Sequence, residues 1–156
     1  MAAFDWPDNV CFVCGSQGSG LQVRFSGNRD GVRAETVIGA PYQGFRGVVH
    51  GGILAGLVDD AMWHVIHQQD NAFPMTAELT VRYLAPVAIG EPLVIEGRLV
   101  SYRPRLMVAE ATVANQQGEV LVRAEGRFMP PREVRDRATR EPGARPAAKG
   151  GEQSAP

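Results

Sequence analysis

The sequence predicts an α+β fold in which one long helix lies against an antiparallel β-sheet. Between Ile53 and Ile66 the apolar residues recur in pairs about 3.6 positions apart, which indicates a helix of roughly four to five turns. On both sides of this stretch, polar and apolar residues alternate, as they do in half-buried strands. The order of the patterns is two strands, the helix and then four more strands.

Glycine, proline and asparagine separate the expected elements. Residues 51–52 open the helix and residues 70–74 close it, while residues 27–31 and 117–118 predict hairpin turns. We expect the strands after the helix to form one long antiparallel meander. The expected strands cover residues 21–25, 32–38, 76–84, 93–100, 106–113 and 120–128.

The first strand after the helix has two distinct faces. Strict alternation puts Leu79, Val81 and Tyr83 on one face, and Thr76 and Arg82 on the other.

Composition divides the chain into three parts. Residues 1–20 are rich in turn-forming residues and predict an irregular lead-in, and residues 21–130 carry the folded domain. Residues 131–156 contain 5 Arg, 1 Lys and 4 acidic residues, with Val134 as their one large apolar residue. Such a segment cannot bury enough surface to offset its ordering entropy, so we predict a disordered tail.

Charge and hydropathy exclude several classes of protein. With 16 basic and 17 acidic residues, the chain is not expected to bind nucleic acid through bulk charge. No run approaches the roughly 18–20 apolar residues of a membrane span, and no basic start followed by an apolar run marks a secretory signal. Two cysteines exclude a disulfide scaffold. We therefore expect a cytoplasmic protein with a single domain.

The beginning of the helix is a candidate reactive site. Gly51 and Gly52 follow a loop and lead directly into the apolar stretch, so we expect uncovered backbone N–H groups at the positive end of the helix dipole. Such groups can stabilise a developing oxyanion. The alternative is a glycine-rich turn that only allows close packing.

Asp59 lies within the apolar part of the helix. It follows Gly52 by about 700° of helical rotation and so returns to within roughly 20° of the same direction, whereas Asp60 points about 80° away. A carboxylate on a core-facing stripe is costly unless it is paired or functional. Asp60 is expected to be solvated or to pair with His64, one turn later.

The distance along the helix separates Gly52 from Asp59. Seven residues span about 10 Å, but a donor and a carboxylate acting on one group must both lie about 3 Å from it. Two antiparallel copies of the helix would bring Gly52 of one chain beside Asp59 of the other. The sequence therefore predicts a site shared across a two-fold homodimer.

These residues resemble a known family. The run from His50 to Asp59, the strand over residues 75–86 and the Cys11-x-x-Cys14-Gly lead-in are similar to the hotdog-fold acyl-CoA thioesterases. The PaaI type, named for phenylacetate degradation, is the most similar group. The resemblance covers roughly residues 10–129. It implies a long central helix wrapped by an antiparallel sheet, in dimers that often pair into tetramers.

The family pattern implies a role for each matching residue. Gly52 matches the glycine whose N–H polarises the thioester carbonyl, and Asp59 matches the acid that acts as nucleophile or general base. His50 matches the histidine that shapes the preceding loop. Thr76 matches a threonine that positions the attacking water or the acid. No metal or redox cofactor is required.

Substrate binding is expected from four further residues. Arg82, Arg103 and Arg105 could meet the phosphates of coenzyme A, although ordinary solvated arginines would have the same pattern. Gly51 adjoins the glycine that polarises the carbonyl. Tyr83 is expected in the core, where it could also line an acyl pocket.

Two groups of residues are weaker candidates for a metal site. His64 and His67 could join Asp60, but closed metal sites usually draw ligands from several elements. Cys11 and Cys14 could be half a zinc site, a redox pair or a buried turn, and a zinc site would need a histidine or a symmetry-related copy. We predict that no metal is bound.

Three functions fit these observations. The leading hypothesis is hydrolysis of an acyl-CoA thioester by a homodimer or homotetramer. A hydratase or dehydratase would need an acid–base pair, for which His50 and Asp59 are a loose match. An acyl-CoA sensor would need an output module, and no DNA-reading helix pair or basic patch is visible. Aryl, short and medium acyl groups all remain open, as do coenzyme A and acyl carrier protein as carriers.

Overall fold

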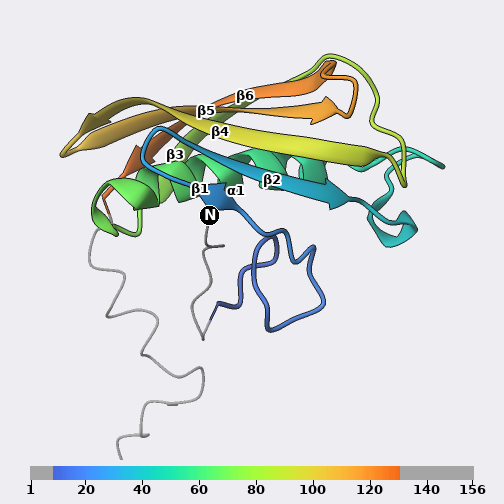
Figure 1. Ribbon diagram of the computed structural model, residues 1–156, viewed down its shortest axis with the longest axis horizontal. Coiled ribbons are helices and arrows are strands. Elements are labelled where there is room, and N and C mark those ends of the chain that lie inside the picture. The colour runs from blue at the N-terminus through green and yellow to red at the C-terminus, as the bar shows by residue number, and fades with distance from the viewer. Residues whose placement is uncertain (1–8, 131–156) are drawn as a thin grey trace, which may run out of the picture.

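Six strands form one antiparallel sheet, and a single helix lies across one face of it (Figure 1). The computed structural model describes residues 9–130, so the expected tail and the first eight residues lie outside the described range. The elements are β1 (Ser26–Gly27), β2 (Gly31–Val37), a 3₁₀ turn (Ala40–Tyr42), α1 (Gly51–Asp70), β3 (Met75–Tyr83), β4 (Pro92–Arg103), β5 (Leu106–Asn115) and β6 (Val120–Met129).

The strand order differs from the expected meander. The order across the sheet is β1-β2-β4-β5-β6-β3, with antiparallel pairing throughout. β4, β5 and β6 do form a meander, but β3 pairs with β6 at the far edge and not with β4. Alternation marks which residues form strands and carries no information about which strands become neighbours, so this part of the prediction was wrong.

The segment before β1 is not the predicted strand. The Leu21 N–H donates to the Phe12 carbonyl and the Val23 N–H to the Val13 carbonyl, both at a distance of 2.8 Å. The segment therefore bonds to the amino-terminal loop. Only Ser26 and Gly27 pair with β2. The alternation still marked the buried side chains correctly, because Val23 and Phe25 are both buried.

α1 has the predicted limits. His50 caps its first turn, and Asn71 ends it in the left-handed region at φ 58°, with its N–H bonded to the His67 carbonyl. The amino-terminal segment lies on the side of α1 away from the sheet, so the wide apolar stripe is covered from two sides (Figure 1). The buried apolar residues of the helix are Leu54, Leu57, Val58, Ala61, Met62, Val65 and Ile66.

α1 approaches the sheet most closely at β4. A Cβ atom added to Gly97 would lie 2.6 Å from the Ala61 carbonyl oxygen, too short for any contact with backbone. The absence of a side chain at this position therefore sets the distance between helix and sheet. Among the described residues, no helix is long and apolar enough to cross a membrane.

Gly97→Ala is expected to lower the free energy of unfolding by about 1–3 kcal/mol, because the added methyl group must push α1 away from β4. Urea denaturation followed by circular dichroism measures the change. Gly39→Ala is the matched control, since a Cβ there meets only Pro41 at an ordinary 3.6 Å. Equal stability of both variants would contradict the role assigned to Gly97.

Candidate active site

His50 covers the first turn of α1. Its Nδ1 accepts the Gly52 N–H at 2.8 Å, while its carbonyl accepts the Ile53 N–H at 3.0 Å. The prediction that the Gly52 N–H is uncovered was therefore wrong for this structure. His50 and Gly52 are both exposed, so a ligand carbonyl can take the N–H if the imidazole turns aside.

A side chain at Gly52 would crowd this cap. A Cβ atom there would lie 3.0 Å from Nδ1 and 3.1 Å from Cε1 of His50, which is tighter than most real contacts. Both glycine and histidine are therefore explained by one local arrangement. The sequence pattern contained both residues but not the hydrogen bond between them.

Tyr83 fastens β3 to the beginning of the helix. Its hydroxyl donates to the Gly51 carbonyl at 2.8 Å, and its ring would contact a Cβ at Gly51 at 3.4 Å. The side chain is 52% exposed, so its expected place in the core was wrong. Gly51 and Tyr83 thus form one side of the exposed helix terminus.

Asp59 pairs with Thr76. The Thr76 hydroxyl donates to Asp59 Oδ1 at a distance of 2.9 Å, so the structure brings these two predicted residues together. Burial raises the pKa of Asp59, the Thr76 hydrogen bond opposes that rise, and the neighbouring Asp60 carboxylate adds to it. The result is a half-buried carboxylate whose pKa lies above the ordinary value.

A bulge in β3 makes this pairing possible. The register with β6 shifts between Thr76 and Glu78, which leaves Ala77 as the extra residue. Thr76 lies opposite Phe128, which is fully buried, and Leu79 lies opposite Gly126. Thr76 therefore faces the helix together with Leu79, and the strict alternation that put them on opposite faces was wrong.

Asp60 points away from Asp59, as the helical phase predicted. Its Oδ1 lies 3.5 Å from Cys11 Sγ, and its Oδ2 lies 3.5 Å from Nε2 of His64. The predicted pairing with His64 is confirmed, and its side chain is only 13% exposed. One helix therefore directs two adjacent carboxylates to different surroundings, Asp59 toward β3 and Asp60 toward the amino-terminal loop.

The three candidate arginines are exposed and lie apart from these residues within one chain. Arg82 lies opposite Arg123, on the face of the sheet away from the helix. Arg103 ends β4, next to Tyr102, whose hydroxyl contacts Asp70 at the carboxyl end of α1. A 20-residue helix is about 30 Å long, so this turn is far from Gly52.

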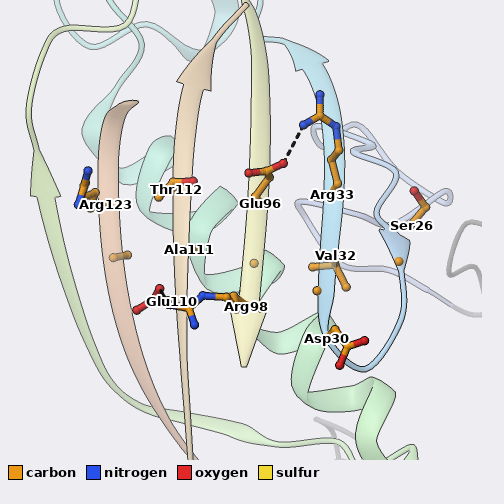
Figure 2. Close-up of a pocket in the computed structure, with 14 residues that line it drawn as sticks. Ser26, Asp30, Val32, Arg33, Glu96, Arg98, Glu110, Ala111, Thr112 and Arg123 are labelled. Atoms are coloured by element: carbon orange, nitrogen blue, oxygen red, sulfur yellow. Dashed lines mark hydrogen bonds and ion pairs between the residues drawn. The ribbon is translucent and has the colours of Figure 1, made fainter. Parts of the chain in front are cut away.

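A separate hollow lies on the outer face of the sheet (Figure 2). Its volume is about 600 Å³, and none of the predicted site residues lines it. Charges of both signs balance there, as in the Arg33–Glu96 ion pair of 2.8 Å. It offers no excess of positive charge for phosphate groups. The charged residues that line it are Asp30, Arg33, Glu96, Arg98, Glu110 and Arg123.

The arrangement offers two chemical functions at separate points of α1. The Gly52 N–H can polarise a carbonyl once the His50 ring has turned aside, and the Asp59 carboxylate, held by Thr76, can accept a proton or attack.

Known proteins share this architecture. Residues 46–122 match the family model of the thioesterase superfamily. A proposed esterase of Saccharolobus solfataricus is 30% identical over 89 residues, which cover 56% of this chain and 59% of that protein. The chain thus matches less than two thirds of that relative's length.

Solved structures confirm the predicted hotdog fold. A Streptococcus mutans protein bound to acetyl CoA superposes with a TM-score of 0.66 at 22% identity, covering 70% of this chain and 88% of the other. The PaaI protein of the Escherichia coli phenylacetic acid degradation operon gives a TM-score of 0.65 at 18% identity, covering 70% and 83%. At these identities the likeness concerns the fold.

Thr76→Val is expected to raise the pKa of Asp59 further, because the carboxylate loses the hydroxyl that stabilises its charged form. Carbon-13 NMR titration of the Asp59 carboxyl group measures the shift. Thr80→Val, on the same strand and exposed, is the matched control and should leave the titration unchanged. An unchanged Asp59 titration in Thr76→Val would show that the hydrogen bond is absent in solution.

Proposed function

We propose that the protein is a thioesterase-superfamily enzyme, whose family model its residues 46–122 match, and that it hydrolyses an acyl-CoA thioester to a free acid and coenzyme A. The observation that carries the proposal is the half-buried Asp59 carboxylate bonded to Thr76, on the helix whose exposed first turn holds the Gly52 N–H under the His50 ring. A half-buried acid with a raised pKa suits proton transfer near neutral pH.

In the proposed reaction the thioester carbonyl accepts the Gly52 N–H after the His50 ring turns aside. Asp59 then takes a proton from water as the water oxygen attacks the carbonyl carbon, or the carboxylate attacks that carbon itself. In either route the carbon–sulfur bond breaks, the electron pair leaves with the coenzyme A sulfur, and that sulfur takes up a proton. In the first route the proton is the one that Asp59 took from water. In the second route water then hydrolyses the acyl–Asp59 anhydride, which releases the free acid and restores the carboxylate. Gly52 stabilises the negative charge that develops on the carbonyl oxygen.

The proposed site needs two chains. Gly52 and Asp59 are seven residues, or about 10 Å, apart on one helix, which is too far for both to act on one carbonyl. β3 is an edge strand of the sheet, and its neighbourhood exposes Met75, Tyr83 and Leu84 by 48–54%. An edge strand with exposed apolar side chains is a surface that readily pairs. We infer a two-fold dimer through β3, with Gly52 of one protomer beside Asp59 of its partner.

Coenzyme A is the proposed carrier. The Streptococcus mutans protein of the same fold is bound to acetyl CoA, which supports this choice. Arg82, Arg103 and Arg105 remain the candidates for its phosphates, as exposed guanidinium groups suited to phosphate.

The hydratase alternative is separated by an assay and not by the geometry. His50 bonds to Gly52 at the start of α1, while Asp59 bonds to Thr76 of β3, so the two form no acid–base pair within one chain, but the inferred dimer would bring His50 of one protomer toward Asp59 of its partner. Assays of enoyl-CoA hydration beside thioester hydrolysis separate the two activities. A sensor that only binds acyl-CoA would turn over neither substrate.

Asp59→Asn is expected to lower kcat for thioester hydrolysis by about 10²–10⁴-fold, because an amide cannot serve as the base. A panel of acyl-CoA substrates, with the free thiol measured, identifies the substrate for the comparison. Asp60→Asn should cost far less, because that side chain points toward Cys11 and His64. The reverse result would assign the chemistry to Asp60.

Asp59→Asn should be at least as stable as the wild type at neutral pH. A raised native pKa means that protonation of Asp59 favours the folded state, and this contribution is lost as pH rises through the native pKa. The ionised carboxylate therefore costs stability at pH 7, and asparagine removes that cost. Melting temperatures at pH 7 and pH 5 should show a smaller benefit at the lower pH. A lower melting temperature at pH 7 would contradict the sign of the pKa shift.

Mixing two inactive variants tests the shared site. Gly52→Pro removes the N–H at a position where the first turn tolerates proline, and Asp59→Asn removes the carboxylate. After the two are unfolded and refolded together, half of the dimers are mixed and each has one intact site, which restores about 25% of wild-type activity. Circular dichroism and sedimentation confirm that each variant folds and dimerises. A fully inactive mixture of folded, exchanged dimers would place both groups of the site in one chain.

A further inference from the structure

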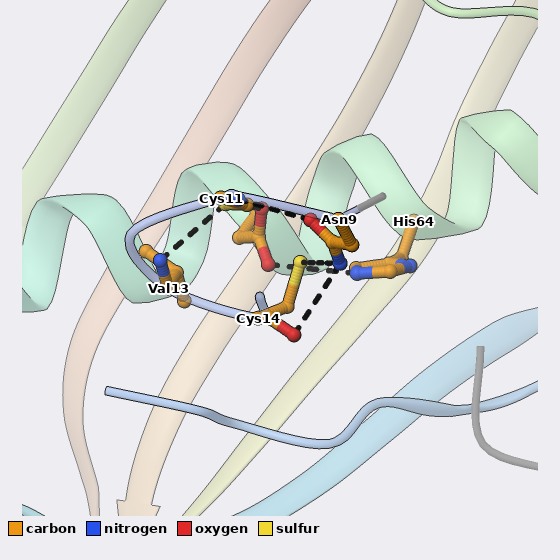
Figure 3. A network of polar contacts seen from close by, with 6 residues as sticks. Asn9, Cys11, Val13, Cys14 and His64 are labelled. Atoms are coloured by element: carbon orange, nitrogen blue, oxygen red, sulfur yellow. Dashed lines mark hydrogen bonds and ion pairs between the residues drawn. The ribbon is translucent and has the colours of Figure 1, made fainter. Parts of the chain in front are cut away.

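Three metal-ligand side chains converge between the amino-terminal loop and α1, away from Asp59. Cys11, Cys14 and Asp60 each present one ligand atom, and these atoms lie within 4.8 Å of one another. In Figure 3 the loop that carries Asn9, Cys11 and Cys14 lies against the helix that carries His64. The sequence placed 45 residues between the cysteine pair and Asp60, so only the fold reveals this group.

N–H groups of the amino-terminal loop donate to both cysteine sulfur atoms. The Val13 N–H donates to Cys11 Sγ at 3.4 Å, and the Asn9 side-chain amide donates to Cys14 Sγ at 3.4 Å. The Gly15 N–H closes the turn on the Cys11 carbonyl at 2.9 Å. A Cβ at Gly15 would lie 2.4 Å from that carbonyl oxygen, so the turn requires glycine. N–H donors directed at sulfur stabilise thiolates, the form that binds metals.

Asp60 supplies an oxygen whose one contact of opposite charge among the described residues is the long ion pair with His64, and which accepts no hydrogen bond from them. This oxygen is Oδ2, and it is buried. A buried carboxylate oxygen in this state costs free energy, and a cation beside it removes that cost. His64, fully buried one helical turn later, has its Nε2 3.5 Å from this oxygen.

The spacing suits a tetrahedral ion. Ligand atoms about 2.0–2.3 Å from a tetrahedral Zn²⁺ lie roughly 3.3–3.8 Å from one another. Cys11 Sγ and Asp60 Oδ1 are already 3.5 Å apart. Because all three ligand atoms lie within 4.8 Å, only a small closing of the group is needed.

Two alternative interpretations are weaker. A metal site formed by Asp60, His64 and His67 is disfavoured because His67 is directed elsewhere: its Nδ1 contacts the Ala72 carbonyl at 2.6 Å and its ring stacks on Trp63. A disulfide between Cys11 and Cys14 would leave the Asp60 carboxylate buried beside it without compensation. Both cysteines are free thiols in the structure.

We propose that Cys11, Cys14 and Asp60 bind a Zn²⁺ ion that fastens the amino-terminal loop to α1, with His64 next to the fourth position. Two thiolates with a carboxylate and an imidazole nearby are ligands that zinc prefers. The ion is structural, because Asp60 points away from Asp59 and the site lies on the helix side covered by the loop. This proposal departs from the sequence-based expectation that no metal is bound.

The test measures zinc in the full chain, purified under reducing conditions, stripped with a chelator and refilled with ZnCl₂. Elemental analysis should find about one zinc per chain, as a single structural site requires. Cobalt substitution should give the visible absorption of tetrahedral Co²⁺ with thiolate charge-transfer bands. Refilling should raise the melting temperature, because the ion binds the folded state.

Variants assign the ligands. Cys11→Ser and Asp60→Asn should each weaken zinc binding at least about tenfold in a competition titration with a chromophoric chelator. Asp59→Asn is the matched control, since it makes the same change at the neighbouring position and should keep zinc affinity unchanged. If Cys11→Ser does not fold, the cobalt spectrum of the wild type and the Asp60→Asn titration still decide the proposal.

Three outcomes would overturn it: no stoichiometric zinc in the reduced chain, zinc affinity equal in wild type and Asp60→Asn, or a cobalt spectrum without thiolate bands. Turnover plays no part in this readout. A chain that binds zinc at these residues but hydrolyses no thioester would contradict only the proposed function.

Discussion

The packing of α1 against the sheet is the constraint on which the other features depend. The missing side chain at Gly97 lets the Ala61 carbonyl approach β4, and the apolar stripe of the helix then fixes its rotation about its own axis. With that rotation fixed, Asp59 can only face β3 and Asp60 can only face the amino-terminal loop. A shift of the helix would disturb both groups at once.

At the candidate active site the Gly52 N–H is covered by the His50 ring, although both residues lie at the surface. A histidine on the Gly52 N–H satisfies a backbone group that would otherwise be open, so the free protein has a closed first turn. Because the ring is exposed, its displacement by a carbonyl exchanges one hydrogen bond for another. In the proposed reaction, the free-energy cost of freeing the Gly52 N–H for the substrate carbonyl is therefore small.

The proposed function and the stability of the fold place opposite demands on Asp59. Burial raises its pKa, which favours proton transfer near neutral pH but makes the ionised form costly to the fold. The Thr76 hydroxyl limits this cost, and the β3 bulge turns that hydroxyl toward the helix. An irregularity in an edge strand thus directs a hydroxyl at Asp59, the proposed reactive group.

The sequence by itself determined most of the elements and the directions of the two acids, because helical and strand periodicity are local properties. The limits of α1, the four strands after it and the 100° between Asp59 and Asp60 all follow from spacing along the chain, whereas the strand expected over residues 21–25 does not form. Tertiary structure decided what spacing cannot encode: the pairing of β3 with β6, the turn of Thr76 at its bulge, the imidazole over Gly52 and the approach of Cys11 to Asp60. Each of these joins groups whose neighbours are set by how the whole chain packs, and long-range packing leaves no periodic mark on the sequence.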